Sequence, residues 1–158
     1  MANYAALSAG GAVKWCAAAS ANSSVRPTTG YQELKGVTSV PAFGDQPGTV
    51  DVTAIANKNR VYIFDLPDSG GTIALTVNDA AEFRSSFASM YSAYTTAEAA
   101  QKWFWIEYAY PSETGIDSFY YPAAVHDIGF GGWEVGAAMQ NSVPIAPAGD
   151  FVKASRSS

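Results

Sequence analysis

Few residues of this chain have the types and spacing that chemistry requires. His126 is the only histidine and Cys16 the only cysteine, so a zinc site or a nucleophile with its own base lacks partners. In a strand, His126 and the adjacent Asp127 point to opposite faces, which favours a structural histidine. Glu113 and Asp117 lie in or beside a turn and carry no glycosidase signature. The sequence therefore predicts no catalytic residues, no cofactor, no metal site and no enzyme.

The charged residues are few, and their signs are unevenly placed. Asp, Glu, Lys and Arg make up 15% of the chain, against about 25% in an average soluble protein, and the net charge is −5. The nine basic residues are scattered singly, with none between Lys102 and Lys153. A protein that binds nucleic acid normally neutralises phosphates with clustered Lys and Arg side chains. We therefore expect no tight binding to DNA.

Length and hydropathy predict one domain without a membrane segment. A chain of 158 residues can bury about 70% of its unfolded surface in a single core. The N-terminal residues lack a basic region and Lys14 interrupts their apolar run, so we expect no signal peptide. No apolar stretch approaches the ~18 residues that a membrane-spanning helix needs. A single cysteine allows no intrachain disulfide and is compatible with a reducing cytosol.

Hydrophobic periodicity predicts one helix among strands. Residues 72–78 alternate between apolar and small polar types, which is typical of a strand with one buried face. Residues 79–95 carry apolar side chains every three or four positions, which predicts an amphipathic helix capped by Asn78 or Asp79. Residues 102–110 alternate bulky groups on both faces, so we expect a central aromatic strand.

Further strands follow from composition. Residues 60–66 are almost continuously apolar, so we expect a strand buried on both faces or covered by the helix. The Pro and Gly residues at 67–71 predict a turn that returns the chain antiparallel beside that strand. Residues 116–128 are expected to form a strand in which Pro122 marks a bulge or an edge. Residues 133–142 alternate again and predict another strand.

The order of several short motifs resembles a known family. A Pro-x-x-Gly-x-x-Pro loop at residues 41–47 precedes strands at residues 50–53 and 58–66 and a Pro-Asp-Ser-Gly-Gly turn at residues 67–71. One amphipathic helix, an aromatic strand, a hairpin and the closing run NSVPIAPAG at residues 141–149 come next. In this order the chain is similar to the major tail tube proteins of long-tailed, siphovirus-like bacteriophages.

The resemblance covers roughly residues 30–152 and implies a mainly β fold, a β-sandwich or barrel of antiparallel strands with one flanking α-helix. Residues 1–30, which are rich in small polar types towards Pro27 and Gly30, are expected to form a partly extended N-terminal arm. Residues 31–152 would then be the single tail-tube domain. Residues 153–158 would be a C-terminal tail.

The same resemblance implies a structural role. Six copies would form a ring, and stacked rings would form a tube through which viral DNA passes to the host without specific binding. Tape measure, tail tip and terminator proteins would be further partners. Such a protein is made in the cytoplasm of the host bacterium and resides in the tail of the virion.

Two sets of residues are candidates for these roles. A smooth wall for DNA needs short side chains without cations, and like charge repels DNA at short range. The expected lumen-lining residues are Thr72, Ala74, Thr76, Glu134, Ala138 and Gln140. Phe43, in the loop at 41–48, is expected either to dock on a neighbour or to pack back on its own core. The expected contacts between subunits or rings are Arg26, Pro27, Pro41, Phe43, Gly44, Asp45 and Pro47.

Two alternatives remain open on the sequence. The tube of a contractile injection machine or of a secretion system would share the same general architecture. A monomeric carbohydrate-binding β-sandwich is the alternative of a different class, because Trp103, Trp105 and Trp133 could form an aromatic platform that stacks on sugars.

Overall fold

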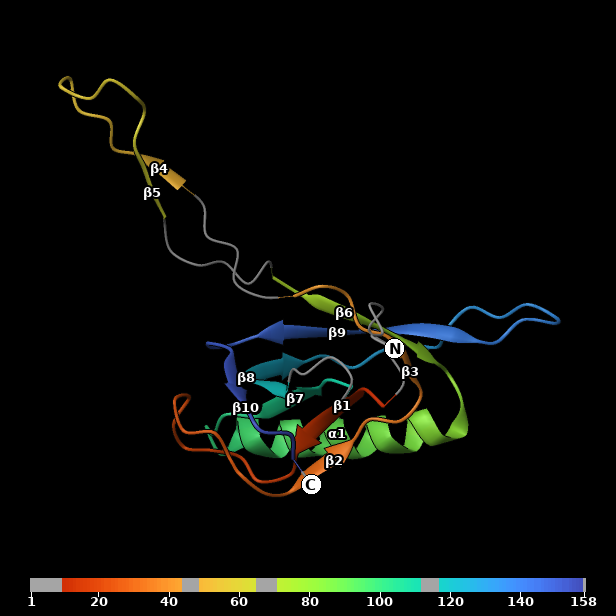
Figure 1. The fold of residues 1–158 in the computed structure, drawn as a ribbon. Helices are drawn as coiled ribbons and strands as arrows, with labels where there is room; N and C mark the ends of the chain where they lie inside the picture. The colour runs from red at the N-terminus through yellow and green to blue at the C-terminus, as the bar shows by residue number, and fades with distance from the viewer. Residues whose placement is uncertain (1–9, 44–48, 65–70, 112–116, 158) are drawn as a thin grey trace, which may run out of the picture.

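The computed structural model describes residues 10–43, 49–64, 71–111 and 117–157. Within these ranges the chain is mainly β, with one helix (Figure 1). The elements are β1 (Ala12–Cys16), β2 (Tyr31–Glu33), β3 (Val37–Ser39), β4 (Thr49–Asp51), β5 (Tyr62–Phe64), β6 (Ile73–Asn78), α1 (Ala81–Ala99), β7 (Trp105–Ala109), β8 (Ser118–Val125), β9 (Gln140–Pro147) and β10 (Val152–Ala154).

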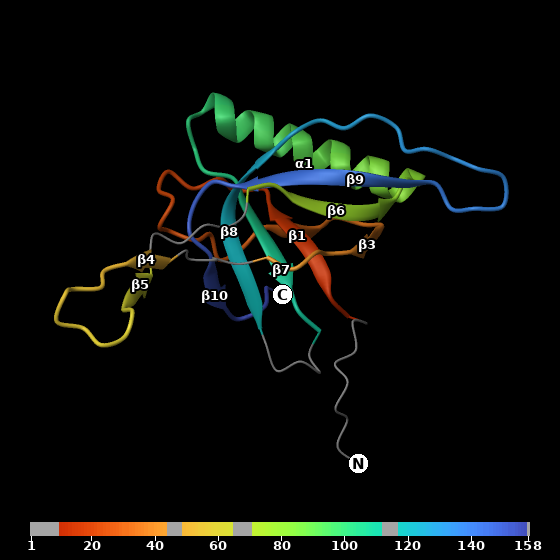
Figure 2. The same ribbon diagram turned by 90° about the horizontal axis from the view of Figure 1, so that it is seen from above.

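Two walls of antiparallel strands share β8. The strand order is β2-β1-β7-β8-β9-β6-β3, and β10 pairs with β8 outside this path. β2, β1, β7 and β10 join β8 in one wall, while β9, β6 and β3 make the other. The helix runs alongside these strands (Figure 2). The predicted fold class, a mainly β sandwich with one flanking helix, is confirmed.

Pro122 lies where β8 changes its partner. Residues 118–120 of β8 pair with β10, and residues 123–125 pair with β9. The missing N–H of proline therefore falls between two ladders, while its carbonyl accepts a hydrogen bond of 2.8 Å from the N–H of Ala148. Gly149 fits here because a Cβ at this position would lie 2.6 Å from the ring of Pro122. At the position where the sequence predicts a bulge or an edge, β8 therefore leaves its pairing with β10 and begins its pairing with β9.

The main core lies between the walls and the helix. Phe83, Phe87 and Met90 of α1 are buried, as the helical period predicts. They belong to one cluster with apolar residues of β1, β6, β7, β8 and β9. A second cluster, around Cys16 and Trp105, covers the other face of the first wall. Because β7 contributes to both clusters, it is buried on both faces, as expected of a central strand.

The helix begins without the predicted cap. Ala80 occupies the N-cap position, and no side chain there bonds to the free N–H groups of the first turn. The carboxylate of Asp79 instead forms an ion pair with Arg84. The helix also extends beyond the predicted range of 79–95, because the Ala- and Glu-containing residues that follow continue it to Ala99.

The segment predicted as an N-terminal arm, residues 1–30, contains a core strand. β1 lies between β2 and β7, and its residues Val13 and Trp15 are buried. The loop that follows β1 is held against the body by an antiparallel bridge between Ser20 and Trp103. The small residues around β1 resemble a linker in composition, whereas the alternation within β1 identifies a strand. Residues 1–9 lie outside the described part of the chain.

Residues 60–66 were predicted as a buried strand, but the described part of this range, residues 60–64, contributes to a projecting hairpin instead. In the described part of the chain β5 pairs only with β4, and Tyr62 and Ile63 are 53% and 54% exposed. β6 pairs with β3 and β9, so the predicted antiparallel return beside residues 60–66 is wrong. Most of the predicted turn at 67–71 lies outside the described residues. An apolar run alone does not distinguish a strand buried in its own core from one that is exposed to solvent.

The strand predicted at residues 133–142 also differs. β9 begins only at Gln140, and residues 126–139 form a projecting loop. The alternation that suggested a strand at Trp133 belongs to this loop, where Trp133 is 78% exposed. Within this loop the chain turns near Gly136, whose φ is +85°, beyond the three glycines between 129 and 132.

Candidate functional site

The outer face of β6 and β9 is small and uncharged. The register pairs Ala74 with Pro144, Thr76 with Ser142, and Asn78 with Gln140, so these side chains share one face. The opposite face carries Ile73, Leu75, Val143 and Ile145 into the core. We call the outer set the neutral face, which consists of Ala74, Thr76, Asn78, Gln140, Ser142, Pro144 and Ala146.

The neutral face unites only some of the predicted lumen-lining residues. Ala74, Thr76 and Gln140 lie on it, and exposed Thr72 immediately precedes β6. Glu134 and Ala138 do not, because both lie in the projecting loop of residues 126–139. Period-two alternation in the sequence correctly predicted the two faces of β6. The same alternation at residues 133–139 was misleading, because these residues lie in a glycine-rich loop.

The β4–β5 hairpin, residues 49–64, projects away from the body (Figures 1 and 2). Its turn is organised by Asp51, which accepts hydrogen bonds from the N–H and hydroxyl of Thr53 and forms a 2.9 Å ion pair with Arg60. The hydrogen bonds from Thr53 lower the pKa of Asp51, with a smaller contribution from Arg60. The exposed apolar residues are Val50, Val52, Ile55, Val61, Tyr62 and Ile63.

The loop of residues 126–139, which we call the aromatic loop, is the second apolar projection. Phe130, Trp133 and Val135 are 84%, 78% and 93% exposed. At its base, Arg84 pairs with Asp79 and donates a 2.9 Å hydrogen bond to the carbonyl of Gly129. The hydrogen bonds from Arg84 hold the pKa of Asp79 below its usual range.

Two further contacts fix the base of the aromatic loop. The guanidinium of Arg84 lies 4.4 Å from the centre of the Phe130 ring, and the amide of Asn141 donates to the carbonyl of Gly129 at 2.7 Å. Gly131 is required, because a Cβ there would lie 2.0 Å from the carbonyl oxygen of Gln140. The loop therefore leaves the body in a defined direction.

The predicted contact residues that can be described pack mainly within the molecule. The guanidinium of Arg26 lies 4.3 Å from the centre of the Tyr120 ring, and the carbonyl of Pro27 accepts a 2.8 Å hydrogen bond from Tyr31. Phe43 takes the second of its two predicted places, 4.7 Å from the ring of Tyr108. Gly44, Asp45 and Pro47 lie outside the described residues.

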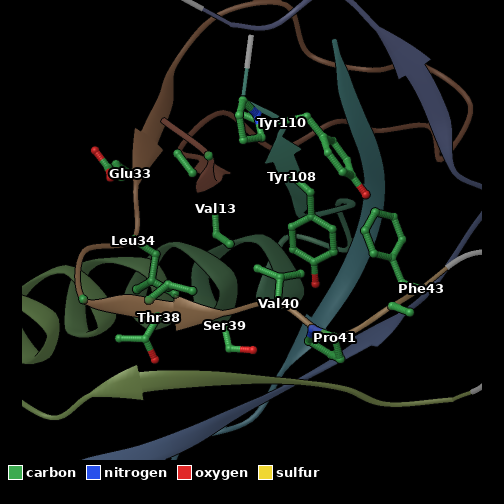
Figure 3. A pocket seen from close by; sticks show the side chains of 17 residues that line it. Val13, Glu33, Leu34, Thr38, Ser39, Val40, Pro41, Phe43, Tyr108 and Tyr110 are labelled. Carbon is green, nitrogen blue, oxygen red and sulfur yellow. The ribbon is translucent and has the colours of Figure 1, made fainter. Parts of the chain in front are cut away.

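Pro41 borders a cavity of about 570 Å³ between the start of β1, the β2–β3 corner and the end of β7 (Figure 3). Val13, Leu34 and Tyr108 point into it. Among the lining residues only Glu33 carries a charge. With one charged residue in its lining, the cavity has no pair of charged groups.

Glu107 is fully buried on the second face of β7. Its carboxylate accepts hydrogen bonds from Ser118, Tyr120 and both the N–H and the hydroxyl of Ser157. Burial opposes the charge, yet these hydrogen bonds outweigh it and lower the pKa of Glu107. The described part of the predicted C-terminal tail, residues 153–157, begins within β10 and is attached to Glu107 through Ser157.

Other chemistry finds little support in the described ranges. No group of three His, Cys, Asp or Glu residues there could hold a metal ion. Within the same ranges, no helix has the length and apolarity to cross a bilayer. The sugar-binding platform is contradicted, because Trp105 is completely buried and Trp133 lies in the aromatic loop.

Comparison with solved structures finds other chains with this fold. A chain in the tail of the empty gene transfer agent (GTA) particle, refined helically with C6 symmetry, matches with a TM-score of 0.56 and 13% identity. The match covers 91% of this chain and 95% of that chain. This chain shares its fold with that tail subunit. The fold expected from the sequence resemblance is confirmed.

Two further structures share the fold. A chain of the six-fold symmetrised baseplate of the anti-feeding prophage matches with a TM-score of 0.62 and 8% identity, over 98% of both chains. A chain of the native GTA virion matches with a TM-score of 0.52 and 13% identity, over 79% of this chain and 89% of that one. No family model and no curated protein matches the sequence.

Proposed function

We propose that this chain is a tail tube protein that assembles into stacked six-membered rings and lines the conduit for a viral genome. The observation that carries the proposal is the fold shared, over 91% of this chain, with a subunit of a C6-symmetric tail. In this proposal the subunit works as a structural part of the virion, and other tail proteins are its partners. It carries out no chemical step.

The neutral face supports the conduit role. Its side chains are short, and none of its seven residues is charged, so it offers DNA neither phosphate-binding cations nor bulky obstacles. We assign Thr72, Ala74, Thr76 and Gln140 to the lumen, together with Ser142. Charge repulsion from Glu134 is not part of this wall, because that residue lies in the aromatic loop.

The β4–β5 hairpin supports self-association. Isolated exposed apolar residues are ordinary on protein surfaces, but here six occur within one two-stranded projection. A hairpin of two strands is marginal by itself in water, so a neighbouring copy that covers these side chains would stabilise it. We therefore assign residues 49–64 to contacts between subunits.

A ring subunit of a contractile injection machine is the second candidate. It is favoured by the match to the anti-feeding prophage baseplate, which covers 98% of both chains. Both candidates require six-fold association. They differ in whether rings continue to stack into a long tube.

Electron microscopy of the purified chain over a concentration series, together with size-exclusion chromatography, tests the proposal. Hollow filaments built of six-membered rings are the expected result. Single rings that never stack would favour the second candidate. A monomer that persists at the highest concentration would contradict self-assembly of this chain.

A further inference from the structure

The aromatic loop and the tip of the β4–β5 hairpin are complementary surfaces that one molecule cannot bring together. They project from opposite ends of the subunit in both ribbon views (Figures 1 and 2). A contact between them would therefore join two copies head to tail, using two different patches. Contacts of this type either close into rings or continue as filaments.

Both projections present apolar side chains to solvent. The tip of the hairpin, residues 52–61, exposes Ile55 fully and Val52 and Val61 in part. The aromatic loop exposes Phe130, Trp133 and Val135. Aromatic side chains that protrude from a surface in this way are the groups that most often dominate interface energetics.

The charges of the two projections have opposite signs. The hairpin tip carries Lys58 and Arg60, of which Arg60 is paired with Asp51. Lys58 has no ion-pair partner within the described part of the chain. The aromatic loop carries Asp127 and Glu134 and no Lys or Arg. Opposite potentials of this kind orient an encounter and disfavour the pairing of two identical projections.

Hydrogen bonds constrain part of each projection before any contact. The Asp79–Arg84 ion pair and the bonds to the carbonyl of Gly129 fix the base of the aromatic loop. The hairpin tip is fixed by a 2.7 Å hydrogen bond from the N–H of Ala54 to the side chain of Asn57. These bonds define the base of the aromatic loop and the turn of the hairpin, which reduces the conformational entropy that association costs.

We propose that the aromatic loop of one copy is the docking site for the hairpin tip of a second copy. Ile55 packs against Trp133 and Val135 of the neighbour, and Lys58 faces Glu134. This pairing rests on the proposed function, because it needs repeated association of one chain with itself. It adds a specific acceptor surface to that function.

Exchange of charge between the two surfaces tests the pairing. Glu134→Lys and Lys58→Glu should each raise the concentration needed for assembly by roughly two- to tenfold, and the double variant should restore it. Light scattering at low salt measures this concentration. Glu98→Lys and Lys102→Glu, at the far end of the helix, are the matched controls and should leave it unchanged.

Cysteine cross-linking tests the same contact by geometry. A chain with Ile55→Cys and Trp133→Cys should give ladders of covalent oligomers under mild oxidation, since Cys16 is buried and does not compete. The control chain with Val25→Cys and Trp133→Cys should give no ladder.

The outcomes separate this inference from the proposed function. If the wild-type chain forms tubes but charge exchange has no effect and no ladder appears, the pairing is refuted and the tube function stands. If single variants are impaired and the double variant is not restored, the pairing is also refuted. If the wild-type chain never associates, the function fails and the pairing fails with it.

Discussion

β5 and β7 are both apolar strands, and their environments are opposite. All five residues of β7 are buried, including the charged Glu107. In β5, Tyr62 and Ile63 are more than half exposed. β7 lies between β1 and β8, whereas β5 has only β4 beside it among the described strands.

This difference teaches that apolar composition marks a strand for burial without saying which molecule buries it. β7 has neighbours on both edges and a cluster on each face, so one chain completes its surroundings. The exposed side chains of β5 become buried only when another molecule covers them, which is what we propose. Stability and assembly should then respond to different strands.

The largest expected effect comes from β7. Ile106 is fully buried in the main core, so Ile106→Ala should lower the free energy of unfolding by about 2–5 kcal/mol, through lost transfer free energy and a cavity. Urea unfolding of dilute monomer measures this change. The same substitution in β5, Ile63→Ala, is the matched control and should change it by less than about 0.5 kcal/mol. Equal effects at the two positions would remove the contrast.

A smaller effect is expected from Glu107. Glu107→Gln should lower the free energy of unfolding by about 1–3 kcal/mol, because hydrogen bonds to a carboxylate become weaker bonds to a neutral amide, and the new NH2 group faces the Ser157 hydroxyl, which already donates. Urea unfolding at neutral pH measures the loss. Deuterium exchange should also be faster at residues 155–157 in the variant.

The contribution of Glu107 to the free energy of unfolding should depend on pH. The pKa of Glu107 is lowered from its ordinary value of 4.5, so its folded state favours the charged form. Its stabilisation is full above pH 4.5 and is lost as the pH falls through the folded pKa. The Gln variant should therefore lose less stability on acidification than the wild type. A variant with the same acid loss as the wild type would contradict the assigned role of Glu107.

The sequence predicted the packed part of the fold well, for identifiable reasons. The helical period at Phe83, Phe87 and Met90 and the alternation of residues 102–110 report on burial within the chain, and both are where expected. Pro122 was also informative, since a missing N–H must fall outside a ladder.

The sequence was less informative where local pattern does not determine the neighbour. Pairing of β6 with β9 rather than β5 joins residues far apart in sequence, which periodicity does not encode. Only part of the neutral face was predicted, because β9 begins later than the alternation from Trp133 suggests. Glu107 was missed, although a lone charge within an aromatic strand is itself a sign of a buried, bonded carboxylate.

The smallest effect on stability should accompany the largest effect on assembly. Tyr62→Ser combined with Ile63→Ser removes exposed apolar surface from β5, so the unfolding free energy of the monomer should stay within about 0.5 kcal/mol of the wild type. The same chain should no longer form filaments in electron micrographs, because the side chains that a neighbour would bury are gone. Val25→Ser, at an apolar position 58% exposed outside the hairpin, should assemble normally. Filaments from the β5 variant would show that the hairpin is not the contact, and the exposure of β5 would then need another cause.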